Sequence, residues 1–319
     1  MSAHRTEGAG RDVPVMDYEG SRYQTDFWVG KGRDYEDAAE RLALKRLLPP
    51  SGAGRRLVEI GAGFGRLGDL YADYDQVILF DYSRSLLAEA AQRWGSDKRY
   101  IFVAGNVYQL PLAAGVVDTL VMVRVMHHLA QVPAALAQLH RVLHGESVAV
   151  LEYANKRNLK ALARWALGKQ GWSPLAHEPV EFVELNFDFH PAWMNDRLQE
   201  AGFAVEQQFA VSHFRLPLFK RVASPQQLAS ADSALFGVGG HFPLSPSIFV
   251  RARAVTPGGP AAHSAPGVTE NVGSLFACPH CRHDGLEAAG DDRLRCPECG
   301  HVYAKVDHVW DLKEQVETV

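Results

Sequence analysis

Three alternating glycines directly follow a short apolar segment that ends in an acidic residue. The segment reads Val58-Glu59-Ile60-Gly61-Ala62-Gly63-Phe64-Gly65. This pattern is typical of a buried strand that turns sharply into a helix and leaves the main chain bare, so that a ligand can approach it closely. A second acid, Asp81, ends the next apolar run, and a carboxylate about 20 residues beyond the glycines suits the two hydroxyls of a ribose. The sequence therefore predicts a site for a nucleoside cofactor, and the alternative is a tight turn without a ligand.

The cysteines form a second group that could do chemistry. All four lie near the C-terminus, as the Cys-x-x-Cys pairs Cys278/Cys281 and Cys296/Cys299. Four thiolates complete a tetrahedral Zn²⁺ shell with no open position. A segment as short as residues 274–319 buries little core, and bound metal would supply the missing stability. We therefore expect a structural zinc ribbon, with a redox dithiol pair as the alternative.

Composition limits the remaining classes. The 319-residue chain has a formal net charge of −4 and a pI of about 6.4, which argues against a broad nucleic-acid-binding surface. The sequence shows no signal-peptide pattern and no apolar run long enough for a membrane span. Because no cysteine precedes the two pairs, a disulfide scaffold is not expected. We therefore expect a reducing, cytoplasmic setting.

Apolar periodicity predicts the elements that position these residues. Strands are expected at 56–60, 76–80, 99–104, 116–123 and 146–152, and helices at 35–48, 64–73, 84–94 and 131–143. Ser83 is the expected N-cap of the third helix, Pro133 suits the first turn of the fourth, and Gly145 is expected to end it. The alternation predicts an α/β fold with a doubly wound, mostly parallel sheet. Ligands of such sheets bind at the carboxyl ends of the strands, where Glu59 and Asp81 fall.

The pattern changes after residue 152. A helix is expected at 192–201, and two antiparallel strands at 203–212 and 246–254 would bring the sheet to seven strands. Residues 171–190 and 215–245 are expected to form insertions over the ligand edge. The predicted organisation is a flexible N-terminus at 1–20, a catalytic domain at 21–255, a Pro/Gly/Ala/Ser-rich linker at 256–273 and the zinc ribbon at 274–319.

Several motifs in order resemble class I S-adenosylmethionine-dependent methyltransferases of the small-molecule type. The glycine segment resembles their first motif, and Phe80-Asp81 resembles their ribose-binding acid. The later resemblances are Gly105-Asn106-Val107 with Leu110-Pro111-Leu112 for the adenine-contact loop, Val117–Val121 for the fourth strand, and Arg124–Leu129 for the loop that follows it.

This resemblance implies a Rossmann-like domain that binds S-adenosylmethionine. Gly61, Gly63 and Gly65 would face the methionine portion, whose amino group Glu59 would bind. Asp81 would bind the ribose. The other implied cofactor contacts are Ala62, Tyr82, Asn106, Val107 and Arg124. Asn106 stands where the family more often has Asp, but its side-chain oxygen accepts the same hydrogen bond; the alternative is a turn residue.

Methyl transfer needs orientation more than covalent help, and a base is required only if the acceptor must lose a proton. His127 and His128 follow the fourth strand and are the candidate bases. The alternative is that one packs under the cofactor and the other caps a loop. Arg124 is the candidate to pair with an acidic group of substrate or cofactor, and a surface salt bridge is its alternative.

The segment Tyr303–Leu312 resembles the tail of Trm112-like zinc ribbons, small proteins that stabilise or activate methyltransferases acting on translation components. The likeness is partial, because Asp307-His308-Val309-Trp310 replaces the usual Asp-Gly-Ile-Pro. It implies either an internal partner for the catalytic domain or a piece that docks a substrate.

The expected function is methyl transfer from S-adenosylmethionine to a small-molecule acceptor, with no membrane partner. Three alternatives stay open. An RNA or a translation factor as the methyl acceptor is favoured by the zinc ribbon and by the basic stretch at 156–170. The alternative interpretation of that stretch is a solvated helix with Trp165 in the core. A nicotinamide oxidoreductase would use the later glycine frame Gly63–Gly68, and a catalytically silent cofactor-binding partner protein would need no base.

Overall fold

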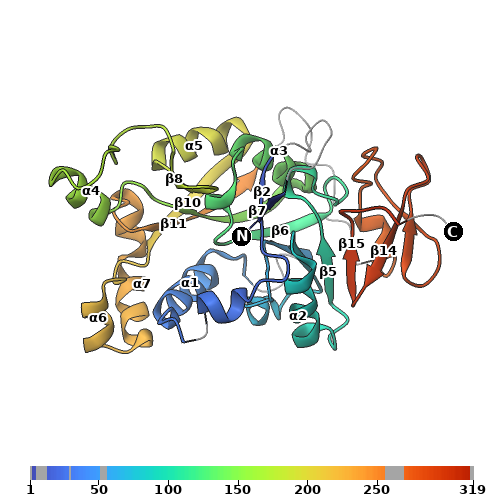
Figure 1. Ribbon diagram of the computed structural model, residues 1–319, viewed down its shortest axis with the longest axis horizontal. Coiled ribbons are helices and arrows are strands. Elements are labelled where there is room, and N and C mark those ends of the chain that lie inside the picture. The colour runs from blue at the N-terminus through green and yellow to red at the C-terminus, as the bar shows by residue number, and fades with distance from the viewer. Residues whose placement is uncertain (1, 5–12, 29, 51–55, 256–268, 317–319) are drawn as a thin grey trace.

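One large sheet dominates the computed structural model, which describes residues 2–4, 13–28, 30–50, 56–255 and 269–316 (Figure 1). The sheet has eleven strands. In spatial order they are β10 (Phe203–Val211), β11 (Ser247–Ala254), β7 (Leu143–Ala154), β6 (Val117–Met122), β3 (Arg56–Ile60), β4 (Gln76–Asp81), β5 (Tyr100–Ala104), β15 (Val309–Asp311), β14 (Val302–Val306), β13 (Arg293–Arg295) and β12 (Glu287–Ala288).

The prediction of a seven-stranded sheet was wrong, because the sheet has eleven strands. The first seven strands in this order correspond to the predicted ones, and β10 and β11 form the predicted antiparallel pair. The sheet continues because β15 pairs in parallel with β5, with Trp310 opposite Val103. An edge strand presents unpaired N–H and C=O groups, and the C-terminal segment satisfies those of β5. Residues 274–316 are therefore joined to the domain predicted at 21–255 rather than separate from it.

Helices cover both faces of the sheet (Figure 1). Side chains of α1 (Asp34–Leu47), α2 (Arg84–Trp94) and α7 (Pro225–His241) belong to one apolar core, and those of α3 (Val132–Val142) and α5 (Pro191–Glu200) belong to the other. The Ser83 side chain accepts a hydrogen bond from the Leu86 N–H, as expected of the N-cap of α2, and Pro133 lies in the first turn of α3.

Two local predictions were wrong. The helix expected at 64–73 is a series of turns with a short 3₁₀ helix, Gly68–Tyr71, because Gly61, Gly63 and Gly65 all have positive φ angles that a regular helix does not contain. Gly145 does not end α3. That helix ends at Val142, because the chain from Leu143 onward already pairs with β6.

Two segments were expected to form insertions over the ligand edge, but α7 packs against α1 and β10 on a face of the sheet, so this prediction was wrong for α7. The chain between β7 and α5 contains α4 (Leu159–Ala166) and the hairpin of β8 (Val180–Val183) and β9 (Asn186–Asp188), and the chain between β10 and β11 contains α6 (Pro217–Val222) and α7. Trp165 on α4 is 42% exposed, so its expected place in the core was wrong.

The N-terminal segment expected to be flexible, 1–20, is described at 2–4 and 13–20, where β1 (Ser2–His4) pairs with β2 (Val15–Asp17). Most of the expected linker, residues 256–268, lies outside the described residues. Among the helices that the structure describes, none is long and apolar enough to cross a membrane.

Candidate functional site

A pocket opens where β3, β4, β5 and β6 end. The cavity has about 700 Å³ of space, including its mouth. Its wall on the sheet side comes from the residues that directly follow these strands, as expected for a doubly wound sheet. These are Gly61 and Gly63 after β3, Asp81 and Tyr82 at the end of β4, Gly105, Val107 and Tyr108 after β5, and Arg124, Val125 and His128 after β6.

The three glycines have different roles. Gly61 lies against the Val125 side chain, since an added Cβ would stand 2.0 Å from Val125 Cγ2. Gly63 faces open space in the pocket and has no such close neighbour. Gly65 does not line the pocket. It packs under Trp94, whose indole N–H donates a hydrogen bond to the Gly65 carbonyl oxygen at 2.8 Å.

The Asp81 carboxylate joins the glycine loop to the start of α2. One oxygen accepts the Gly63 N–H at 2.8 Å, and the other accepts the Ser83 N–H at 2.9 Å. Burial raises the pKa of this carboxyl, and the two backbone donors oppose that rise. Each carboxylate oxygen can accept a second hydrogen bond, so the side chain can still receive a diol from the pocket.

Glu59 lies behind the pocket wall rather than in it, with only 4% of its surface exposed. Burial raises the pKa of this carboxyl to about 8, although the positive charge of Arg66 acts in the opposite direction. One of its oxygens has no hydrogen-bond partner within the described chain. A buried carboxyl of this kind is available to a cationic group that enters beside it.

Residues near the N-terminus form the outer wall of the pocket. Val15, Met16, Tyr18 and Tyr23 line it, and the Tyr18 hydroxyl lies 3.2 Å from His128 Nε2. Val15, Met16 and Tyr18 were not predicted because residues 1–20 were expected to be flexible, and Tyr23 was not predicted because no element was expected before the helix at 35–48. The available signal was the cluster of apolar and aromatic side chains between Val13 and Trp28.

Arg124 is fixed from several sides. It has a φ angle of 61°, and its backbone N–H donates to Glu152 at 2.8 Å. Its guanidinium forms an ion pair with the buried Glu40 at 2.5 Å, and Glu40 also pairs with Arg66 at 2.8 Å. Arg124 therefore pairs with an acid of the protein itself. This pair is neither the expected contact with an acid of substrate or cofactor nor the alternative surface salt bridge, because Glu40 is buried.

The two histidines differ in position. His128 lines the pocket, and its Nδ1 lies 2.9 Å from the Leu185 carbonyl oxygen. Since a carbonyl only accepts, Nδ1 carries the proton, and in the neutral ring Nε2 accepts from Tyr18. Burial lowers the pKa of His128. His127 does not line this pocket. Burial, followed by the neighbouring His128 and Arg124, lowers its pKa well below the ordinary value.

Five sequence-predicted residues therefore lie outside the pocket lining: Glu59, Ala62, Gly65, Asn106 and His127. Asn106 caps the short turn after β5, where its side-chain oxygen accepts the Tyr108 N–H at 2.9 Å. This is the turn role that the sequence left as the alternative. Asn106 faces a second groove, between the catalytic domain and the C-terminal strands, together with Tyr82, His301 and Lys313.

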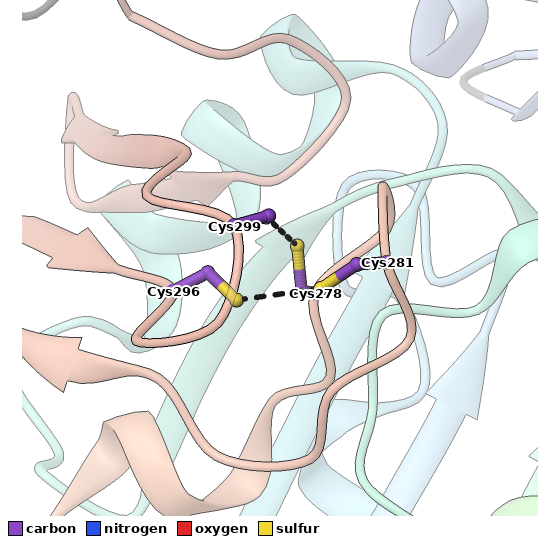
Figure 2. A group of neighbouring side chains, drawn as sticks. All are labelled: Cys278, Cys281, Cys296 and Cys299. Atoms are coloured by element: carbon purple, nitrogen blue, oxygen red, sulfur yellow. Dashed lines mark hydrogen bonds between the residues drawn. The ribbon is translucent and has the colours of Figure 1, made fainter.

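The four cysteines converge as expected (Figure 2). Their sulfur atoms all lie within 4.8 Å of one another. Cys278 and Cys299 are 3.6 Å apart, and Cys281 and Cys296 are 3.5 Å apart. Four thiolates around one Zn²⁺, with Zn–S bonds of about 2.3 Å, would be separated by about 3.8 Å. The four thiols are free, and their donor set fits a structural zinc ion.

Comparisons with known proteins match part of the chain. Residues 58–151 match the family model described as a methyltransferase domain. A relative from Mycolicibacterium smegmatis, described as a "probable S-adenosylmethionine-dependent methyltransferase", is 31% identical over 192 residues, which are 60% of this chain and 64% of the relative. The chain thus spans slightly less than two thirds of this curated relative's length.

Solved structures share the fold. An S-adenosylmethionine-dependent methyltransferase from Mesorhizobium loti is 22% identical, with a TM-score of 0.51 over 69% of this chain and 99% of that chain. A chain from the complex of the Haloferax volcanii Trm112 methyltransferase activator is 16% identical, with a TM-score of 0.50 over 72% of this chain and 97% of that chain. The family match, the curated relative and the fold together support an S-adenosylmethionine-dependent methyltransferase domain.

Proposed function

We propose that this protein transfers the methyl group of S-adenosylmethionine to a small-molecule acceptor. The observation that carries the proposal is the meeting of bare glycine backbone, Asp81 and His128 in one pocket at the carboxyl edge of the sheet. In this arrangement Gly63 gives room to the methionine portion, Asp81 accepts the ribose hydroxyls, and Tyr82 and Val107 flank the adenine. Glu59 receives the amino group from behind the glycine loop.

The reaction is a displacement at carbon. A lone pair of the acceptor attacks the methyl carbon, the carbon–sulfur bond breaks, and the sulfonium becomes a neutral thioether. A protic acceptor also loses one proton to a base. Holding the reacting atoms in line supplies much of the acceleration, about 7–11 kcal/mol in well-oriented systems. Arg124, locked by Glu40 and Glu152, keeps the loop after β6 in place beside this reaction centre.

A small acceptor is favoured because the approach to the pocket is covered. The N-terminal segment supplies Tyr18 and Tyr23 to its outer wall. The carbonyl oxygen of Leu185, at the turn of the β8–β9 hairpin, accepts a hydrogen bond from His128 Nδ1. A bulky folded substrate would have to displace these contacts.

An RNA acceptor is the second candidate, because Trp165 is exposed on a basic helix. Lys160 and Arg164 share α4 with it, and an exposed aromatic ring beside cations can stack on a base next to a phosphate. Salt-dependent binding of RNA that is lost in Trp165→Ala would promote this candidate.

We also propose that the C-terminal segment is a Trm112-like zinc ribbon that acts as a built-in stabiliser of the catalytic domain. The parallel pairing of β15 with β5 supports it. So do two contacts near the pocket: Asp311 lies 3.9 Å from Arg84 of α2, and the Lys313 ammonium lies 4.9 Å from the centre of the Tyr82 ring.

Calorimetry with S-adenosylhomocysteine and with NADH tests the cofactor. Binding of S-adenosylhomocysteine but not of NADH supports the proposal. Binding of NADH but not of S-adenosylhomocysteine would establish the oxidoreductase alternative. Tritiated-methyl labelling of a cell extract, separated into small molecules, RNA and protein, then identifies the acceptor class. Label confined to RNA or protein would refute the small-molecule acceptor while leaving methyl transfer intact.

A further inference from the structure

The helix α4 leaves its apolar side open to solvent. Of its eight residues, only Ala161 is buried. Leu159, Ala163 and Ala166 share one side of the helix by their spacing, and all three are exposed, Leu159 by 61%. Leu167, which follows the helix, is 68% exposed. A single exposed apolar residue is ordinary on a protein surface, but a whole apolar helix side without cover indicates an interaction site.

Caps at both ends hold α4 in its helical form. The Asn158 side chain accepts the Ala161 N–H at 2.9 Å. At the other end Gly168 has a φ angle of 67°, and the Lys169 N–H donates to the Arg164 carbonyl oxygen at 2.7 Å, as in a helix that ends at a glycine. The apolar side of α4 is therefore presented by a helix that is formed without a partner.

The C-terminal end of α7 continues this apolar surface. Phe242, which ends α7, is 70% exposed, and Val238, one turn earlier, is 67% exposed. The Leu244 backbone joins the two helices, because its N–H donates to the Phe242 carbonyl oxygen and its carbonyl oxygen accepts the Leu159 N–H at 2.9 Å. Both helices lie at the end of the molecule away from β14 and β15 (Figure 1). We call Leu159, Leu167, Val238 and Phe242 the apolar patch.

Basic side chains border the apolar patch. Lys160 and Arg164 lie on α4, and Lys169 follows it. All three are exposed, and within the described chain none of them forms an ion pair. Helix α4 contains no acid, the one acid of α7, Asp232, is buried, and the exposed acids that follow α4 come only at 178–184. This local positive charge contrasts with the net charge of −4, so the partner that covers the patch should be negatively charged.

We propose that the apolar patch and its basic border dock this protein on an anionic lipid surface. An amphipathic helix with Lys and Arg beside Leu and Trp lies in the bilayer interface, where its apolar side chains enter the acyl region and its cations meet the headgroup phosphates. Trp165, exposed on α4, suits this boundary because its ring is apolar and its N–H is polar. We expected no membrane partner because no apolar run could span a bilayer, but a helix in the interface needs no such run.

Two other occupants match the patch less completely. RNA would engage the cations and Trp165, but it offers no apolar surface to aliphatic side chains such as Leu159 and Val238. A second copy of the chain would place the same basic helix on both sides of a twofold contact through α4, so that like charges would meet. An anionic bilayer surface covers the apolar side chains and neutralises the cations together.

Co-sedimentation with vesicles tests the docking. The full-length protein should bind vesicles of equimolar phosphatidylcholine and phosphatidylglycerol, should bind pure phosphatidylcholine much more weakly, and should lose affinity as salt is raised. Hydrogen exchange of the wild-type protein should slow in residues 159–167 when the anionic vesicles are added. No binding to the anionic vesicles, or unchanged exchange of 159–167 in the bound protein, would overturn the proposal.

Charge variants test the basic border. Lys160→Gln, Arg164→Gln and Lys169→Gln together should weaken binding to the anionic vesicles roughly 100-fold, since each cation near such a surface contributes about fivefold. The matched control removes three exposed cations from α2, the turn after it and β13: Arg93→Gln, Lys98→Gln and Arg293→Gln. This control should bind within about threefold of the wild type, because distant charges are screened. Equal losses in the two proteins would mean that only net charge matters and would overturn the proposal.

Apolar variants test the insertion. Leu159→Asn and Phe242→Asn should each weaken vesicle binding at least about fivefold, because each removes apolar burial in the acyl region. The control Val255→Asn, at a side chain that is 44% exposed beyond β11, should leave it unchanged. All three should keep the wild-type melting temperature, since the sites are exposed. Undiminished vesicle binding of Leu159→Asn and Phe242→Asn would overturn the insertion. Binding of RNA but not of vesicles, or a dimer that Phe242→Asn dissociates in a protein that binds no vesicles, would assign the patch to those occupants instead.

Discussion

Glu59 offers a sharp test of the cofactor site, because its charge should change when the ligand binds. Burial raises the pKa of this carboxyl to about 8, so at pH 7 about 0.9 of the molecules carry a proton there. An ammonium placed beside a carboxyl favours the ionised form. If the amino group of S-adenosylhomocysteine enters beside Glu59, binding at pH 7 should therefore release close to one proton.

Calorimetry in two buffers measures this release. Phosphate and Tris differ in ionisation enthalpy, so the apparent binding enthalpy should differ between them by about 0.9 of that difference. Glu59→Gln should abolish the buffer dependence, and Glu178→Gln, whose side chain is 81% exposed, should preserve it. Equal enthalpies in the two buffers for the wild-type protein would refute the placement of the amino group.

The same carboxyl should make stability depend on pH. The folded-state pKa of about 8 lies above the ordinary 4.5. The contribution of the protonated Glu59 carboxyl to the free energy of unfolding is therefore complete below pH 4.5 and is lost as pH rises through 8. The full shift corresponds to roughly 5 kcal/mol in the free energy of unfolding. Urea titrations at pH 5, 7 and 9 should show this decline in the wild type and a smaller decline in Glu59→Gln. A similar decline in both proteins would contradict the assignment.

Three further predictions concern the loop, the ribose acid and the metal. Gly61→Ala should lower the free energy of unfolding by at least about 2 kcal/mol, since the new Cβ would meet Val125. Gly115 has a similar φ angle but open space around it, so Gly115→Ala should lower the free energy of unfolding by about 1 kcal/mol. Equal losses for the two variants in urea unfolding would argue against the steric reason. Asp81→Ala should weaken S-adenosylhomocysteine binding at least about tenfold in calorimetry, whereas the exposed Asp75→Ala should not; unchanged affinity would remove Asp81 from the site. Purified protein should contain about one zinc ion per chain by elemental analysis, and Cys296→Ser should lose it; full zinc retention in that variant would show that the metal is held elsewhere.

Much of the central sheet could be predicted because its strands are buried and appear in the sequence as mostly apolar runs. The strand expected at 56–60 matches β3, and the helix expected at 84–94 matches α2. The glycine loop was recognised, but its conformation was not, because positive φ angles replace the expected helix with turns. The extra strands could not be predicted: β15 has only three residues, and its pairing depends on an edge that β5 leaves free in the folded domain.

The site was predictable where a residue directly follows a strand and less so elsewhere. Asp81 and Arg124 fall at strand ends, so their place at the pocket follows from topology. Leu185 belongs to an insertion, and its contact with His128 depends on the path of the β8–β9 hairpin across the sheet edge. Tyr18 reaches His128 from 110 positions away in the chain. Contacts of this kind have no local sequence pattern.

The proposed zinc ribbon and the proposed cofactor pocket meet at one strand. β5 pairs with β4 on one side and with β15 on the other, and its end leads directly into Gly105 and Val107 of the pocket wall. The Leu312 N–H donates to the Ala104 carbonyl oxygen at 2.9 Å, so the ribbon holds the last residue of β5. Loss of zinc would release this edge without touching any residue of the pocket. We therefore expect zinc removal by a chelator to weaken S-adenosylhomocysteine binding and re-addition of zinc to restore it. Unchanged affinity after verified loss of the metal would mean that the catalytic domain holds β5 without the ribbon.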